Sequence, residues 1–122
     1  MPTLRRLKTR PEFLRVARSG RKWATPGLVL QAGSAVQDAP GDDIGIGFTA
    51  SRKVGNAVDR NRARRRLKAA VAEVLPQDGR AGRDYVVIAR AGTLKRPYGL
   101  LLGDLRQALR RVSAPAKPRT RA

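Results

Sequence analysis

A strict two-residue alternation marks residues 44–51, IGIGFTAS, more clearly than any other part of the chain. Such a pattern predicts a strand that buries one face. The apolar face carries Ile44, Ile46, Phe48 and Ala50, and the other carries Gly45, Gly47, Thr49 and Ser51. That second face is nearly bare of side chains, and glycine weakens a strand. Two explanations remain open at this point: the close approach of another backbone or a ligand, or a glycine-tolerant edge or bulge.

Apolar runs predict further strands before and after this one. Residues 27–36, GLVLQAGSAV, are apolar with β-branched members, which is typical of a strand. Residues 84–92, DYVVIARAG, are apolar on both faces, as expected for a central strand. Residues 20–25, GRKWAT, are a candidate for a further short strand, and residues 37–43, QDAPGDD, have the composition of a turn.

Apolar positions at helical spacing predict three helices. The first spans about residues 10–18 and the second about residues 57–75. A loop over 76–83 follows the second helix, because it begins with the helix breaker Pro76. The third helix lies within residues 94–112.

This order of helix, strands, helix, strand and helix predicts one α+β domain over residues 9–112. We expect a small two-layer sandwich, with a sheet of about four strands and the helices packed on it. Residues 1–8 are expected to form a flexible basic arm. Residues 113–122 have no apolar periodicity, two prolines and several basic residues, so we expect a disordered basic tail.

The charge balance of the chain indicates what kind of partner the protein binds. The chain has 27 Lys and Arg residues against 9 acidic ones, a formal net charge of +18 on 122 residues. Such a charge repels itself unless a polyanion screens it. Nucleic acid is therefore the first candidate partner, and an anionic membrane surface is the second.

The chain contains no Cys and no His. This composition excludes disulfides, the usual zinc sites, Ser-His and Cys-His nucleophiles and a histidine general base. No apolar run approaches the roughly 20 residues of a membrane span. The basic start of the chain has no hydrophobic region behind it, unlike a secretory signal. We therefore expect a cytoplasmic protein.

The basic charge is concentrated in residues 56–71, NAVDRNRARRRLKAAV. Asn56 is a candidate helix cap, with Asp59 in the favourable first turn. Arg60 falls within the apolar sector of the helical wheel, where an unpaired charge would be very costly. We expect the first turn to extend beyond the core, so that Arg60 points into a groove or to a partner. The core face consists of Ala63, Leu67, Ala70, Val71, Val74 and Leu75.

A solvated helix face normally mixes both signs of charge, so this one-sided run favours a polyanionic partner. Composition alone leaves other binding modules open, such as a ribosomal protein or a DNA-architectural protein. It also leaves open a nuclease that acts alone and uses Asp42 and Asp43. However, the acidic residues are scattered except for that pair, and a two-metal nuclease site needs several convergent carboxylates.

The segment SRKVGNAVDRNRARRRLKAAV, residues 51–71, closely resembles the signature of the protein component of bacterial ribonuclease P. The family pattern is a basic pair, then Gly-Asn-Ala-Val, then Arg-Asn-Arg and further basic positions. The resemblance covers roughly residues 4–112. It includes a first helix with Phe13 and a following Gly20, the Gly-rich alternating strand, and the DYVVIAR segment.

The resemblance implies an α-β-β-β-α-β-α fold with a left-handed crossover. It also implies a ribonucleoprotein endonuclease in which a catalytic RNA, using Mg²⁺ or a similar ion, removes the 5′ leader from precursor tRNA. The protein would bind that RNA and the leader and would carry no catalytic residue. No metal ligand on the protein, no membrane and no obligate protein partner is indicated.

Carried over by position, the resemblance assigns two sets of residues. The leader cleft would include Phe13, Val29 and Leu30, and two further cleft positions that are often aromatic in the family are Ala17 and Gln31 here. Trp23 and Tyr98 are further candidates for base stacking, beside the more ordinary role of core packing. The catalytic RNA would contact Arg52, Lys53, Asn56, Arg60, Asn61, Arg62, Arg64, Arg65 and Lys68.

Overall fold

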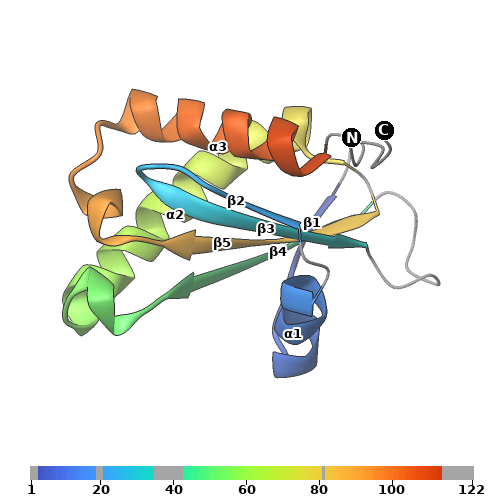
Figure 1. Cartoon of the computed structure of the whole chain (residues 1–122), viewed down its shortest axis with the longest axis horizontal. Helices are drawn as coiled ribbons and strands as arrows, with labels where there is room; N and C mark the ends of the chain where they lie inside the picture. The colour runs from blue at the N-terminus through green and yellow to red at the C-terminus, as the bar shows by residue number, and fades with distance from the viewer. Residues whose placement is uncertain (1–2, 19–20, 35–42, 81, 114–122) are drawn as a thin grey trace, which may run out of the picture.

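A computed structural model describes residues 3–18, 21–34, 43–80 and 82–113. In these residues one sheet is formed, with the strand order β1-β4-β5-β3-β2, and helices lie on both of its faces (Figure 1). The strands are β1 (Thr3–Arg6), β2 (Arg21–Ala24), β3 (Leu28–Ser34), β4 (Asp43–Ala50) and β5 (Arg83–Ala89). The helices are α1 (Arg10–Arg18), α2 (Ala57–Asp78) and α3 (Tyr98–Ser113), with the 3-10 helices η1 (Arg52–Val54) and η2 (Ala91–Leu94).

The sheet is mixed. β4 and β5 are parallel neighbours joined through α2, while β5 pairs antiparallel with β3, and β3 with β2. The predicted α+β class and the order α-β-β-β-α-β-α are confirmed, and the short strand expected within residues 20–25 is β2. The left hand of the β4-α2-β5 crossover stays a prediction from the resemblance.

The predicted flexible arm over residues 1–8 is wrong for residues 3–6, which form β1. This strand pairs parallel with β4, with Leu4 opposite Ile44, and the Leu7 amide donates to the Ile46 carbonyl at 2.9 Å. The described part of the sheet therefore has five strands rather than about four. The physical reason is that Leu4 packs against the main core and Leu7 is buried.

Several predicted boundaries also shift. Helix α2 continues to Asp78 with Pro76 inside it, because a proline near the end of a helix removes only one hydrogen bond of the last turns. The Gly79 amide then donates to the Leu75 carbonyl at 2.8 Å and closes the helix. The strand predicted over 84–92 ends at Ala89, and η2 follows it before α3 begins. Two predicted segments lie outside the described residues: the turn over 37–43, except Asp43, and the tail over 113–122, except Ser113.

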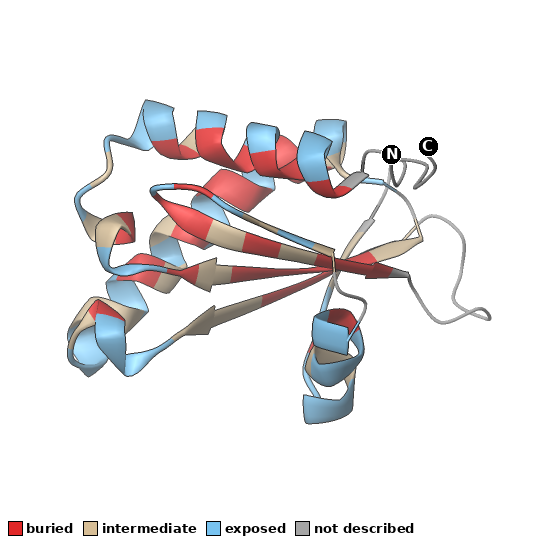
Figure 2. Cartoon of the chain, in the orientation of Figure 1, coloured by how far each residue is buried: buried red, intermediate tan, exposed pale blue. Residues whose placement is uncertain are grey.

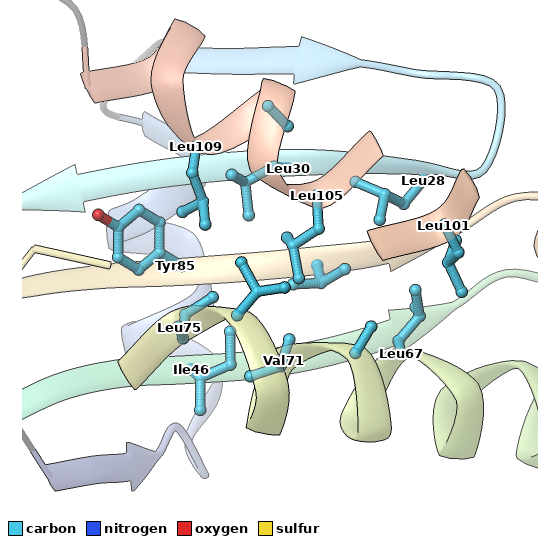
Figure 3. Close-up of a cluster of buried hydrophobic side chains, with 14 of the residues drawn as sticks. Leu28, Leu30, Ile46, Leu67, Val71, Leu75, Tyr85, Leu101, Leu105 and Leu109 are labelled. Carbon is cyan, nitrogen blue, oxygen red and sulfur yellow. The ribbon is translucent and has the colours of Figure 1, made fainter. Parts of the chain in front are cut away.

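The main core lies between one face of the sheet and helices α2 and α3. Figure 3 shows Leu67, Val71 and Leu75 of α2 and Leu101, Leu105 and Leu109 of α3 pointing toward Leu30, Ile46 and Tyr85 of the sheet. In Figure 2 the buried positions follow the strands and the inward sides of these helices. No helix in the described ranges is long and apolar enough to cross a membrane.

Helix α1 packs on the opposite face of the sheet with a smaller core. Leu7, Val16 and Val86 are buried there, and Phe13 and Ile88 pack against them while half-buried. Alternation along β5 explains the division: Tyr85 and Val87 belong to the main core, whereas Val86 and Ile88 point to α1. The sheet thus separates a surface formed by α2 from a surface formed by α1.

Candidate nucleic-acid interface

The start of α2 is fixed by hydrogen bonds within the basic segment. Asn56 and Asp59 form a capping box, in which the Asp59 amide donates to Asn56 Oδ1 at 2.9 Å and the Asn56 amide donates to Asp59 Oδ2 at 3.3 Å. Gly55, just before the cap, has φ +143°, a conformation that favours glycine. A Cβ at Gly55 would lie 2.3 Å from the Asp59 carboxylate. The predicted cap is confirmed, and it orients the first turns of α2.

Arg60 is not an unpaired buried charge. Its Nη1 donates to the Gly55 carbonyl at 3.1 Å, and the residue is half-buried. The side chain therefore turns back along the first turn of α2, toward the loop that enters the helix. This contact explains how a cation occupies a position where the helical wheel favours an apolar residue.

The other basic residues of η1 and α2 face outward from the core. Within the described residues, no ion pair joins any of them to an acidic side chain. Arg64 donates to the Asn61 side chain, a contact that leaves its charge in place. The exposed positions are Arg52, Lys53, Asn56, Asn61, Arg62, Arg65 and Lys68, while Arg60 and Arg64 are half-buried.

Arg66 differs from its neighbours, because its guanidinium is bound by backbone. Nη1 donates to the carbonyls of Thr93 at 2.6 Å and Leu94 at 2.8 Å, and Nη2 donates to the carbonyl of Arg96 at 2.6 Å. Arg66 therefore joins α2 to the segment between η2 and α3. No local pattern in the chain indicates this role, because the three partners are 27 to 30 residues away.

On the α1 face, side chains of this chain cover the glycines of β4. A Cβ at Gly47 would lie 2.5 Å from the Phe13 ring, and a Cβ at Gly45 would collide with the Asp84 carboxylate. Close approach is therefore the reason for the bare face, although the approaching groups are side chains rather than another backbone or a ligand. The Phe13 ring reaches the sheet because Gly47 leaves room for it.

Four of the cleft positions carried over from the resemblance are compatible with a surface beside α1. Phe13, Val29 and Gln31 are half-buried, and Ala17 on α1 is exposed. Ile88 is half-buried opposite Val29 in the β3–β5 register and packs near α1. Sequence reasoning missed Ile88, although the alternation of β5 places it on the same face as Val86.

Leu30 does not belong to this cleft. It is fully buried in the main core, on the α3 side of the sheet. Successive side chains of a strand point to opposite faces, so Val29 and its neighbour Leu30 cannot both face α1. The assignment of Leu30 to the leader cleft is therefore wrong.

An ionic network holds β1 and α1 on this face. Arg5 Nη2 donates to the buried Asp84 at 2.9 Å, and Arg5 Nη1 donates to Glu12 at 3.2 Å. Burial raises the pKa of Asp84, and the charge of Arg5 partly opposes that rise. Backbone N–H groups of Lys8 and Thr9 lower the pKa of Glu12. The network ties the amino-terminal segment to the start of β5.

Comparison with known proteins decides the family. A family model described as Ribonuclease P matches residues 1–113. The chain belongs to the bacterial ribonuclease P protein family. It is 60% identical over 115 residues to the ribonuclease P protein component of Paramagnetospirillum magneticum, covering 93% of this chain and 86% of the relative. The corresponding protein of Gluconacetobacter diazotrophicus is 52% identical over 107 residues, covering 88% of this chain and 90% of the relative.

Solved structures give the same result for the fold. The RNase P protein of Staphylococcus aureus superposes with a TM-score of 0.70 at 25% identity, covering 86% of this chain and 92% of that one. The RNase P protein of Thermotoga maritima superposes with a TM-score of 0.72, covering 90% and 99%, and at 22% identity it supports the fold alone. Membership makes this chain the protein component of ribonuclease P, the ribonucleoprotein endonuclease that removes the 5′ leader of precursor tRNA with its catalytic RNA.

Carboxylates do not gather into a metal site in the part of the chain that the structure describes. No group of three or more Asp, Glu, His or Cys residues there is arranged to hold a metal ion. Asp84 and Asp104 bind Arg5 and Arg96 respectively. Asp43 begins β4, and Asp42 lies outside the described residues.

Proposed function

We propose that the basic surface of η1 and α2 binds the catalytic RNA of ribonuclease P. This basic helix face consists of Arg52, Lys53, Asn56, Arg60, Asn61, Arg62, Arg64, Arg65 and Lys68. The observation that carries the proposal is the run of basic side chains over residues 60–68 of the capped helix α2, with no described ion pair to neutralise it. Like charges at this spacing destabilise an isolated helix. RNA phosphates would remove that repulsion, and arginine offers them bidentate hydrogen bonds.

The core side of α2 supports this assignment. Leu67, Val71 and Leu75 anchor the helix in the main core, so the basic side chains project from a rigid element. A rigid site loses little conformational entropy when it binds. The basic helix face is therefore suited to set the position of the protein on the RNA.

We further propose that the α1 face binds the 5′ leader of precursor tRNA. Its half-buried apolar centre consists of Phe13, Val29 and Ile88, and Leu30 does not belong to it. Aromatic rings stack on unpaired bases largely without regard to sequence. Ala17 and Gln31 provide no ring, so base stacking in this cleft depends on Phe13.

In this proposal the protein takes no chemical step. We expect the divalent ion needed for hydrolysis, Mg²⁺ or a similar ion, to be held mainly by the RNA. The protein contributes binding, orientation and charge neutralisation. The cytoplasmic location and the lack of an obligate protein partner stay predictions.

Reconstitution tests the proposal. The protein is added to a bacterial ribonuclease P RNA at low Mg²⁺, and both RNA binding and precursor cleavage are measured. We expect Arg64→Ala to weaken RNA binding, whereas Arg110→Ala, an exposed arginine on α3, leaves it unchanged. Equal affinities for the wild type and both variants would refute the role of the basic helix face.

A further inference from the structure

A shallow, open pocket of about 340 Å³ lies beside the basic helix face, between α2 and the start of α3. Arg62, Arg65, Arg66, Ala69 and Tyr98 line it, and we call it the Tyr98 pocket. Its volume falls in the range of small-ligand sites. Ala69 is exposed, and its small side chain leaves room between the arginines and the ring.

Tyr98 is fixed at the surface rather than packed in a core. It is 38% exposed, and its hydroxyl donates to Glu73 Oε2 at 2.8 Å. The carboxylate on α2 therefore orients a ring that is carried by α3. A partly exposed aromatic ring with a fixed orientation is suited to stacking on a planar ligand.

The charge around this ring is mainly positive. Arg62 and Arg65 are exposed, and the guanidinium of Arg66 is held by three backbone carbonyls, which leave its charge in place. Glu73 is the nearby acid, and its carboxylate already accepts the Tyr98 hydroxyl. Three cations against one acid favour an anionic ligand, and the ring favours one with a planar aromatic group.

We propose that the Tyr98 pocket takes one unpaired nucleotide of the catalytic RNA, with its base on Tyr98 and its phosphate beside Arg62 and Arg65. A nucleotide combines the planar group and the negative charge that the pocket requires, whereas an acidic peptide would use only the cations. Arg62 and Arg65 also belong to the basic helix face, so an RNA strand on that face passes the pocket. This inference rests on the proposed function and adds a base contact to a surface otherwise made of phosphate contacts.

Three substitutions separate this contact from general charge and from folding. Tyr98→Leu removes the aromatic ring, Tyr98→Phe keeps the ring and removes the bond to Glu73, and Ala69→Leu fills the pocket without removing any partner. We expect Tyr98→Leu and Ala69→Leu to weaken binding of the catalytic RNA by roughly fivefold or more, the lower end for one stacked base. Tyr98→Phe should stay within about twofold of the wild type, because the stacking face remains. The slope of log Kd against log salt should not change, because no cation is lost.

The matched control is Leu100→Ala, which removes an exposed apolar side chain two residues along α3 (Leu100 is 52% exposed) and should bind RNA like the wild type. Thermal unfolding of each variant reports any loss of folding. If Tyr98→Leu unfolds, Ala69→Leu decides, because it leaves Tyr98 and its bond intact.

A cross-linking experiment locates the contact. The chain has no cysteine, so Ala69→Cys provides a single thiol for a photoreactive group, and Gln107→Cys on α3 is the control position. We expect Ala69→Cys to cross-link to one region of the RNA within the assembled holoenzyme and Gln107→Cys not to. If both pocket variants bind RNA normally while Arg64→Ala weakens binding, the pocket is not an RNA site and the basic helix face stands. If Arg64→Ala also has no effect, the proposed function itself fails.

Discussion

Replacing Arg66 by methionine separates structural arginines from RNA-binding arginines on the same helix. The guanidinium of Arg66 donates to the carbonyls of Thr93, Leu94 and Arg96 at 2.6 to 2.8 Å. Methionine keeps much of the aliphatic length and removes all three bonds. The variant should therefore lose these three bonds between α2 and the segment that leads into α3.

The size of the effect follows from the exposure of the three acceptors. Thr93 is fully buried, so its unpaired carbonyl costs about 1 to 3 kcal/mol. Leu94 and Arg96 are half-buried, so water replaces much of what is lost and each contributes under about 1 kcal/mol. We expect the free energy of unfolding to fall by about 2 to 4 kcal/mol, which corresponds to a decrease in Tm on the order of 10 °C for a domain of this size.

Urea denaturation followed by circular dichroism measures this effect, and Arg65→Met is the matched control. Arg65 is exposed and adjacent, and its substitution removes the same charge. We expect Arg65→Met to change stability by less than about 0.5 kcal/mol and to weaken RNA binding instead. Equal stability of Arg66→Met and Arg65→Met would refute the reasoning, because the three carbonyl contacts would then contribute nothing.

Two further predictions concern the α1 face. Gly47→Ala should destabilise the protein by about 1 to 3 kcal/mol and weaken precursor binding, because the new methyl group would meet the Phe13 ring at 2.5 Å. The control is Gly103→Ala, whose Cβ meets nothing within 4 Å. Unchanged precursor binding by Gly47→Ala would contradict the role given to Phe13. For Asp84, burial raises the folded-state pKa, so the folded state binds the proton more readily than the unfolded state. Its contribution to stability is therefore largest below the ordinary aspartate pKa of about 4 and decreases as the pH rises through the folded pKa. Chemical denaturation from pH 4 to 7 should show the free energy of unfolding of the wild type falling relative to that of Asp84→Asn as the pH rises. A relative rise for the wild type would contradict this assignment.

The sequence correctly predicts the features whose interacting residues lie close together in the chain. The capping box of Asn56 and Asp59 spans three residues, and the core side of α2 repeats at helical spacing, so both were visible in the chain alone. The alternation of β4 likewise gave its buried face. The reason for its bare face was not visible, because Phe13 lies more than 30 positions before Gly47.

Features that depend on distant partners escaped prediction. β1 carries a single leucine, Leu4, and is followed directly by Leu7, while its pairing partner β4 begins about 40 residues later. Arg66 looks like its neighbours until the carbonyls near η2 are placed beside it. The assignment of Leu30 to the leader cleft is wrong for a different reason: neighbouring side chains of a strand point to opposite faces, so Leu30 faces the main core when Val29 faces α1.

The salt dependence of RNA binding tests the central claim most directly. The affinity for a bacterial ribonuclease P RNA is measured across a series of salt concentrations for the wild type, Arg62→Gln/Arg65→Gln on α2, and Arg106→Gln/Arg110→Gln on α3, which removes the same charge. If the basic helix face binds RNA phosphates, the α2 pair lowers the slope of log Kd against log salt by about 1.4 to 1.8, or about 0.7 to 0.9 per lost contact, and the α3 pair leaves it unchanged. Equal slopes for the two pairs would show that only net charge matters and would contradict the assigned interface.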